Sequence, residues 1–204
     1  MTRFIVTGTD TDIGKTVFAA GLAGALGAHY WKPVQAGIDP EGDKEAVARL
    51  ANLPADHILP EAYRLKTPAS PHLAARLDGV EISLDKLALP PIDGPLVVEG
   101  AGGVLVPVSE TLLMADIFAH WGLPVILCAR TALGTINHSL LSIEALRSRG
   151  VPLAGIAFIG DAHVENERII PALGNVPSLG RLPRLDPLNA QRLKAAFTAN
   201  IRLP

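Results

Sequence analysis

The chain has 204 residues, of which 49% are hydrophobic and only 4% aromatic, with a single cysteine and a net charge of −2 from 18 basic and 20 acidic residues. This charge balance excludes the basic surface typical of nucleic-acid or anionic-membrane binding, and one cysteine excludes an internal disulfide framework. The length suits one domain, residues 1–204, with a mainly aliphatic core.

Apolar runs alternate with helix-like stretches along the chain. In order, we predict strand 3–7, helix 16–28, strand 30–33, helix 44–51, strand 96–99, helix 112–121, strand 125–128, helix 136–149, strand 153–159, helix 164–173, strand 178–182 and helix 188–199. Such alternation predicts right-handed βαβ units. The expected fold class is therefore α/β: a three-layer, doubly wound, mainly parallel sheet with helices on both faces. Cys128 falls in a strand and is expected to be a small core residue.

No apolar run reaches the length of a membrane span. The first predicted strand starts almost at Met1 and leaves no room for a signal peptide. We therefore expect a cytoplasmic protein with no membrane partner and no nucleic-acid partner.

Residues 4–16 have the pattern of a phosphate-binding loop, in which an apolar run ends in Gly8 and Gly14-Lys15-Thr16 opens a helix. Backbone N–H groups at a helix N-terminus attract polyphosphate. The lysine of such a loop reaches the β- and γ-phosphates, and its threonine hydroxyl ligates Mg²⁺. Five residues separate the two glycines, one more than in the common pattern. The segment predicts nucleotide binding.

Three charged residues fall close to the P-loop in the predicted fold. Lys32 ends the second strand, where its side chain either extends to solvent or points into the site. Glu99 ends the most apolar strand and is followed by the flexible backbone of residues 100–103, so its carboxylate is well placed to ligate the same Mg²⁺. Asp43 begins a helix, and a role as N-cap explains it when it is taken alone. The six histidines show no metal-ligand spacing.

Five motifs occur in order along the chain: Val6-Thr-Gly-Thr-Asp-Thr-Asp-Ile-Gly-Lys-Thr16, Lys32-Pro-Val34, Ser70-Pro-His72, Val98-Glu-Gly-Ala-Gly-Gly103 and Leu133-Gly-Thr-Ile-Asn-His138. Together they resemble the dethiobiotin synthetases, a family of the P-loop NTPase superfamily. The similarity extends from residue 4 to about residue 185. The long phosphate-binding loop is also similar to that family's variant.

The resemblance implies an ATP- and Mg²⁺-dependent ligase of biotin synthesis that acts on 7,8-diaminononanoate. One amino group and CO₂ form a carbamate, and a carbamate oxygen attacks the γ-phosphate to give a carbamic–phosphoric anhydride. The second amine then closes the ureido ring. The products are dethiobiotin, ADP and phosphate.

The resemblance also implies roles for individual positions. Lys15 and Lys32 would stabilise charge on the carbamate and the transferring phosphoryl group, with Lys32 the residue usually called catalytic. Thr16, Asp43 and Glu99 look like the Mg²⁺ ligands. The nucleotide and its metal would contact Asp12, Ile13, Gly14, Lys15, Thr16, Val17, Asp43, Glu99, Gly100, Ala101, Gly102, Pro183, Arg184 and Leu185. The diamine would contact Thr11, Lys32, Ala36, Gly134, Thr135, Ile136 and Asn137. The family is similar in forming homodimers, with residues 134–137 of one subunit reaching the site of the other.

The chain departs from the family pattern in two places. Many members have Ser or Thr where Ala36 stands, so we expect Gln35 or a backbone group to make that substrate contact. Many members read the base with an Asn-Asp pair where this chain has Phe158-Ile-Gly-Asp161. We therefore expect backbone groups to read the base, with looser selectivity for adenine.

Two other interpretations remain open at this point. A ParA/MinD-like ATPase switch shares the architecture, but such switches carry a second lysine five residues before the P-loop lysine, where this chain has Asp10. The chain also lacks a basic amphipathic tail. An amidotransferase-type domain acting on a corrinoid precursor usually belongs to a longer chain with a second catalytic domain.

Overall fold

The computed structural model describes residues 2–38 and 41–203 and contains a six-stranded sheet in the order β2-β5-β1-β6-β7-β8. All neighbouring pairs are parallel. The strands are β1 (Arg3–Gly8), β2 (His29–Trp31), β5 (Leu96–Gly103), β6 (Val125–Arg130), β7 (Leu153–Ile159) and β8 (Ser178–Leu182). The predicted α/β class with a mainly parallel sheet is confirmed.

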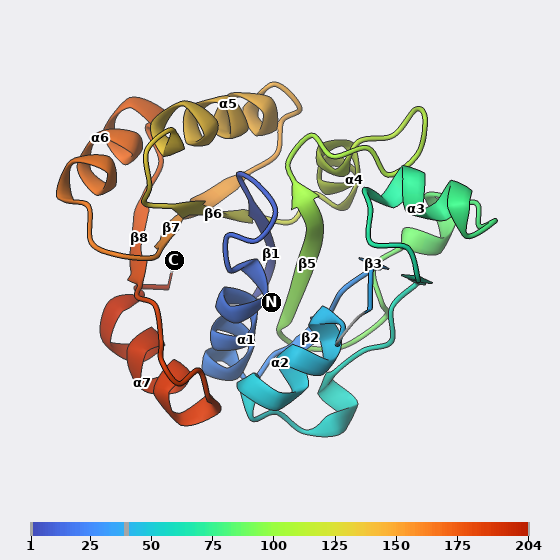
Figure 1. Cartoon of the computed structure of the whole chain (residues 1–204), viewed down its shortest axis with the longest axis horizontal. Coiled ribbons are helices and arrows are strands. Elements are labelled where there is room, and N and C mark those ends of the chain that lie inside the picture. The colour runs from blue at the N-terminus through green and yellow to red at the C-terminus, as the bar shows by residue number, and fades with distance from the viewer. Residues whose placement is uncertain (1, 39–40, 204) are drawn as a thin grey trace.

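Helices cover both faces of this sheet (Figure 1). Three of them pack around one buried cluster: α1 (Lys15–Leu26), α2 (Asp43–Ala51) and α7 (Ala190–Asn200). Three others contribute to the cluster on the opposite face: α4 (Met114–Trp121), α5 (Thr135–Arg147) and α6 (Val164–Gly174). The result is the expected three-layer arrangement.

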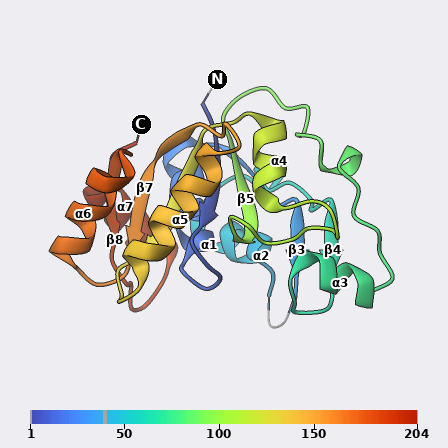
Figure 2. The same ribbon diagram turned by 90° about the horizontal axis from the view of Figure 1, so that it is seen from above.

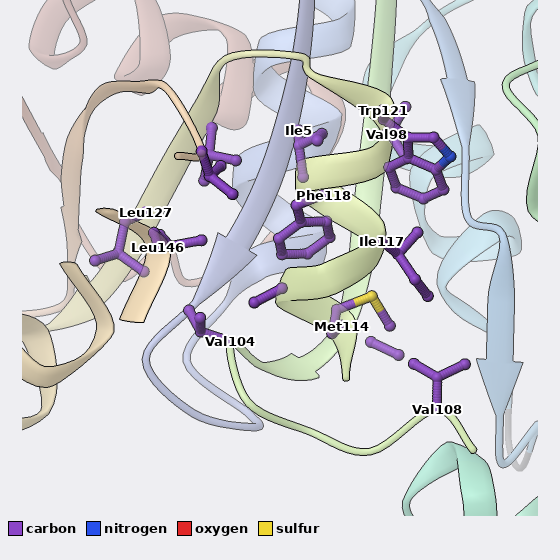
Figure 3. Close-up of a cluster of buried hydrophobic side chains, with 14 of the residues drawn as sticks. Ile5, Val98, Val104, Val108, Met114, Ile117, Phe118, Trp121, Leu127 and Leu146 are labelled. Atoms are coloured by element: carbon purple, nitrogen blue, oxygen red, sulfur yellow. The ribbon is translucent and has the colours of Figure 1, made fainter. Parts of the chain in front are cut away.

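The core follows from the alternation of side chains along the strands. In β1, Phe4 and Val6 enter the cluster under α1, whereas Ile5 enters the cluster under α4 and α5. A strand buried on both faces needs apolar residues at successive positions, and residues 4–6 supply them. Figure 3 shows Ile5 with Phe118 and Trp121 of α4 in the second cluster. Because the strands are parallel, their carboxyl ends lie at one edge of this packed sheet.

A second, two-stranded sheet consists of β3 (Val34–Ala36) and β4 (Tyr63–Leu65). It lies with α3 (Pro71–Leu77) at the end of the molecule opposite β8 and α6 (Figure 2). Two 3₁₀ turns, η1 (Ala55–His57) and η2 (Asp85–Leu87), complete the described elements. The sequence predicted none of the elements between residues 52 and 95, because three-residue strands, 3₁₀ turns and the seven-residue helix α3 are too short to show a hydrophobic period.

The prediction of one strand over residues 30–33 is wrong. β2 ends at Trp31, and β3 begins at Val34 in the other sheet. Pro33 separates them: it has no N–H to donate to a ladder, and its carbonyl accepts a bond from the Tyr63 N–H at 3.0 Å instead. Lys32 consequently lies in the connection between two sheets.

The remaining strands and helices lie where they were predicted, with boundaries that differ by a few residues. The largest difference is in β5, which continues four residues past Glu99 to Gly103. No helix in residues 2–38 and 41–203 is long and apolar enough to cross a membrane.

Candidate active site

The phosphate-binding loop connects the end of β1 to the start of α1. Gly14 is the N-cap of α1 and has a left-handed backbone with φ of 93°. A Cβ at Gly8 would collide with the Ile13 side chain, which folds back over the strand end. Both glycines are therefore required for the compact path of the loop, and that path presents the first N–H groups of α1 to a ligand.

Lys15 is buried and faces the polar floor of the site. Its Nζ donates to the Asp10 carbonyl oxygen at 2.7 Å. Burial and the nearby Lys32 ammonium lower the pKa of Lys15. The side chain of Asp10 pairs with Arg130 at the end of β6, at 3.1 Å. The position five residues before Lys15 thus anchors the loop to the sheet.

Lys32 is only 3% exposed and contacts both predicted carboxylate ligands. Its Nζ lies 2.6 Å from Asp43 Oδ2 and 3.0 Å from Glu99 Oε1, and it donates to the Gly100 carbonyl at 3.0 Å. Burial alone lowers the pKa of Lys32, but the Glu99 and Asp43 carboxylates outweigh it, so that the net shift is upward. The sequence left open whether the Lys32 side chain extends to solvent or points into the site, and in the structure it points into the site.

The Thr16 hydroxyl stands between the same two carboxylates, 2.9 Å from Asp43 Oδ1 and 2.9 Å from Glu99 Oε1. Burial raises the pKa of Asp43, yet the contacts with Lys32 and Thr16 hold it below its usual value. A threonine of the loop, a lysine of the β2–β3 connection and two carboxylates therefore form one polar cluster.

Two expectations about these carboxylates need correction. Glu99 is an interior residue of β5, so it does not end its strand, and it is completely buried. Asp43 is the first residue of α2, and Gly42 is the N-cap. Asp43 directs its side chain at Lys32 and Thr16, contacts that capping does not explain.

Gln35 does not project freely toward a substrate. Its Nε2 donates to the Gly37 carbonyl at 2.8 Å, and its Oε1 accepts from the Asp43 N–H at 3.0 Å. Both ends of the amide are thus used to hold the start of α2 against β3. The expectation that Gln35 replaces the missing hydroxyl at Ala36 finds no support in these contacts.

A cavity of about 830 Å³ opens above the cluster. Most of the predicted site residues line it, namely Thr11, Asp12, Gly14, Lys15, Thr16, Lys32, Ala36, Asp43, Glu99, Ala101 and Gly102. Gln35 lines it too, and so does Ser70, which was not predicted to be a site residue. The Ser70 hydroxyl lies 3.0 Å from His72 Nδ1, so the Ser-Pro-His motif places a hydroxyl in the same cavity as Ala36.

The other predicted residues do not line this cavity. Ile13 is a buried residue of the loop, and Val17 lies in the first turn of α1. Gly100 contributes its carbonyl to Lys32. Pro183, Arg184 and Leu185 follow β8, and Gly134, Thr135, Ile136 and Asn137 open α5. Asn137 is exposed, and Leu133 beside this turn is fully exposed.

Sequence reasoning missed Tyr30, a fully buried residue whose hydroxyl donates to Glu99 Oε2 at 2.8 Å. Burial and the neighbouring Glu99 raise the pKa of Tyr30 well above its usual value, so it remains a donor. An aromatic residue in a predicted strand gives no signal of a polar contact, because its ring alone accounts for its place in the core.

Comparison with known proteins agrees with this fold. A family model described as an AAA domain matches residues 2–192. The chain is similar to solved structures of a ParA family ATPase from Chlorobium tepidum (TM-score 0.56, 14% identity, covering 97% of this chain and 92% of that one) and of MinD in the Aquifex aeolicus MinC:MinD complex (TM-score 0.53, 14% identity, covering 96% and 86%). At this identity the likeness shows the fold alone.

Curated relatives are far more similar. The ATP-dependent dethiobiotin synthetase BioD of Rhodopseudomonas palustris (strain HaA2) is 67% identical over 96% of this chain and 92% of the relative. The proteins of the same name from Agrobacterium fabrum and Novosphingobium aromaticivorans are 62% and 60% identical, over 98% and 100% of this chain and 95% and 98% of the relatives. The chain therefore belongs to the family of ATP-dependent dethiobiotin synthetases.

Proposed function

We propose that this chain, as one ligase domain, forms dethiobiotin from 7,8-diaminononanoate, CO₂ and ATP with Mg²⁺. A carbamate formed from CO₂ and one amine takes the γ-phosphoryl group of ATP and releases ADP. The second amine then attacks the carbamoyl carbon and expels phosphate, which closes the ureido ring. The observation that carries the proposal is the cluster of two buried lysines, two carboxylates and a threonine hydroxyl at the floor of one cavity.

The cluster fits a Mg²⁺ ion held by Thr16, Asp43 and Glu99. The Thr16 hydroxyl has one hydrogen but lies 2.9 Å from an oxygen of each carboxylate, so it can donate to only one of them at a time. Two carboxylates and a hydroxyl form the incomplete all-oxygen set that Mg²⁺ accepts when phosphates and waters fill its other positions. Within the described ranges, no group of three or more His, Cys, Asp or Glu could hold a metal alone. When bound, Mg²⁺ neutralises charge between the β- and γ-phosphates.

The two lysines supply fixed positive charge where anions meet. Lys15 Nζ rests on a backbone carbonyl, and a phosphate oxygen can replace that contact with a stronger charge-assisted bond. Lys32 stays protonated between two carboxylates, and its short contacts orient it toward the cavity. Phosphoryl transfer spreads negative charge over several oxygens, so pre-positioned cations stabilise its transition state directly.

The diamine is proposed to enter the cavity beside Lys32 and Ala36 and to extend past Thr11. Thr11 and Val106 line both this cavity and a neighbouring hollow of about 400 Å³. That hollow is bordered by Leu105 and by Leu141 of α5, two exposed apolar side chains. A long aliphatic substrate can therefore run from the phosphate loop to the face formed by α5.

The same face supports the proposal of a homodimer. Leu105, Leu133 and Leu141 are all exposed there, and a second copy of the chain would remove them from water. Residues 134–137 do not line the cavity of their own chain. Thr135 is buried and its hydroxyl donates to the Arg130 carbonyl at 2.6 Å, but Gly134 and Asn137 are exposed and can reach the site of a partner. The first N–H groups of α5 are suited to the carboxylate of the diamine.

A coupled assay for dethiobiotin, with diaminononanoate, bicarbonate, ATP and Mg²⁺, tests the function. We expect phosphate release that requires both the diamine and bicarbonate and that matches dethiobiotin formation one to one. Phosphate release that does not depend on the diamine but increases when a protein partner is added would instead indicate an ATPase switch.

A further inference from the structure

The Glu99 carboxylate is the most heavily used acceptor in the site. Its Oε1 lies 2.9 Å from the Thr16 hydroxyl and 3.0 Å from Lys32 Nζ. Its Oε2 accepts from the Tyr30 hydroxyl at 2.8 Å. Glu99 is completely buried at the floor of the cavity, so these protein groups are its polar partners.

Tyr30 reaches Glu99 from the neighbouring strand. In the parallel register of β2 and β5, Tyr30 pairs with Val97, two residues before Glu99. Residues two apart share a face of a strand, so the phenol ring runs along that face toward Glu99. The ring is itself fully buried and belongs to the same apolar cluster as Val97 and Phe18. Packing thus fixes the hydroxyl in place.

We propose that Tyr30 is a positioning residue that orients the Glu99 carboxylate for Mg²⁺–nucleotide binding. The terminal torsion of a glutamate is broad, so a carboxylate held through one oxygen can turn. With Oε2 held by Tyr30, Oε1 is directed at the Thr16 hydroxyl and Lys32. The inference rests on the proposed function, because it deepens the role of the same site.

The sharpest test is Tyr30→Phe, which removes one hydroxyl and keeps the ring. Tyr63→Phe is a matched control, since the chain has only these two tyrosines and Tyr63 is also buried. The Tyr63 hydroxyl accepts from the Ser83 N–H at 2.9 Å, and it makes no contact with Glu99 in the described part of the chain. Each variant removes a phenolic hydroxyl with a hydrogen-bond partner, the Tyr63 bond being part-buried, but only Tyr30→Phe removes a contact to Glu99.

Calorimetry would measure ADP affinity with excess EDTA and again with Mg²⁺. For Tyr30→Phe we expect ADP affinity in EDTA within about twofold of wild type. We expect the Mg²⁺-dependent gain in affinity to fall by about tenfold or more, the usual effect of losing an outer-shell partner of a metal ligand. Tyr63→Phe should keep the full gain. Equal Mg²⁺ dependence in Tyr30→Phe and wild type would overturn the proposal, as would an equal loss with and without Mg²⁺.

A second measurement does not depend on the stability of Tyr30→Phe. The Tyr63→Phe chain labelled with 3-fluorotyrosine carries a single fluorine probe, at Tyr30. We expect its ¹⁹F resonance to shift when Mg²⁺ is added to the ADP complex, and a resonance that does not respond would contradict the proposal. Neither binding experiment requires turnover, so a failure of the dethiobiotin assay would be distinguishable from a failure here.

Discussion

At the residue scale, the site depends on opposite charges held very close together and away from water. Lys32 lies within 3.0 Å of both Asp43 and Glu99, and both carboxylates also lie 2.9 Å from the hydroxyl of Thr16. Removing one member of such a buried group leaves another without its partner, which costs more than the loss of a surface ion pair. Substitutions that conserve shape are therefore the informative ones.

Lys15→Ala should nearly abolish turnover and leave the fold intact. Loss of a pre-positioned cation or donor at a transition state typically lowers kcat by about 10²- to 10³-fold. Steady-state kinetics together with a thermal melt would measure both properties. Lys194→Ala, an exposed lysine of α7, is the control. A folded Lys15→Ala protein with near-normal turnover would show that the phosphate-site assignment is wrong.

Glu99→Gln should weaken the use of Mg²⁺ more than the binding of nucleotide. The amide keeps the shape and one acceptor, but it lacks the negative charge that a hard cation prefers. The expected result is a Mg²⁺ midpoint for turnover raised by about tenfold or more, with a smaller change in ATP affinity. Titration of activity against Mg²⁺ at saturating ATP measures it, and an unchanged midpoint would remove Glu99 from the metal site.

At the scale of elements, the ends of neighbouring strands and helices bring the site together. Ile159 at the end of β7 lies close to Gly14 of the phosphate loop: a Cβ added at Gly14 would come within 3.0 Å of the Ile159 side chain. Gln35 of β3 fixes the first residue of α2 and thereby Asp43. Lys44 and Glu61 form a further link, at 2.7 Å, between α2 and the segment before β4. Asp43 is thus held from two sides.

Nucleotide selectivity should be looser than in family members with an Asn-Asp pair. Ile159 and Gly160 stand at that place, and the Gly160 carbonyl is already bonded to Arg181 at 3.1 Å. A wrong base is rejected when it leaves polar groups of the site without a hydrogen-bond partner. A site with fewer such groups therefore discriminates less strongly between bases. We expect kcat/KM for GTP and CTP within about 10²-fold of that for ATP. A much stronger preference for ATP would mean that backbone groups read the base effectively.

Asp116 should stabilise the start of α4 in a pH-dependent way. It accepts from the Leu113 N–H at 2.9 Å and from Arg149 Nε at 2.7 Å. Burial raises the pKa of Asp116, but these contacts, Arg149 first, hold it below its usual value. A carboxyl group whose pKa is lower in the folded protein than in the unfolded chain stabilises the fold at pH values above its unfolded-state pKa. This stabilisation is lost as the pH falls through the folded-state pKa.

Asp116→Ala should therefore lower the melting temperature at neutral pH by about 2–4 °C, the shift that corresponds to losing a cap worth about 1 kcal/mol. The deficit should shrink as pH falls below 4, where the carboxyl becomes protonated. Thermal melts across pH measure it against Asp93→Ala, an exposed aspartate with no ion pair in residues 2–38 and 41–203. A deficit independent of pH would show that the charge does not matter.

At the scale of the whole molecule, the chain places its proposed substrate-tail loop outside its own cavity. Residues 134–137 open α5 beside exposed Leu133, whereas the cavity lies over β1, β5 and the β2–β3 connection. In a homodimer with shared sites, the loop of one chain would lie at the cavity of the other chain. In such an arrangement each site combines Lys15 of one chain with Asn137 of the other.

Mixing Lys15→Ala chains with Asn137→Trp chains tests the shared site. Asn137 is exposed, whereas Gly134 has a φ of 91° that would strain any side chain placed there. Random exchange of equal amounts should restore about a quarter of wild-type activity, because half of the dimers are mixed and each mixed dimer has one intact site. If subunit exchange is verified and no activity returns, the two residues act within one chain.

The sequence by itself determined the fold class, the phosphate loop and the family. These features are local: a period of apolar residues, two glycines before a lysine, and short motifs in a set order. The expected strand ends also placed Lys32 and Glu99 near the loop, because parallel strands bring their carboxyl ends to one edge, whereas Asp43 was identified through the resemblance to the family. Only the tertiary structure decided which of their atoms meet, and it alone revealed Tyr30 and the bonds of Gln35. Tyr30 and Glu99 are 69 residues apart, and a contact across two strands depends on their register, which no local pattern encodes.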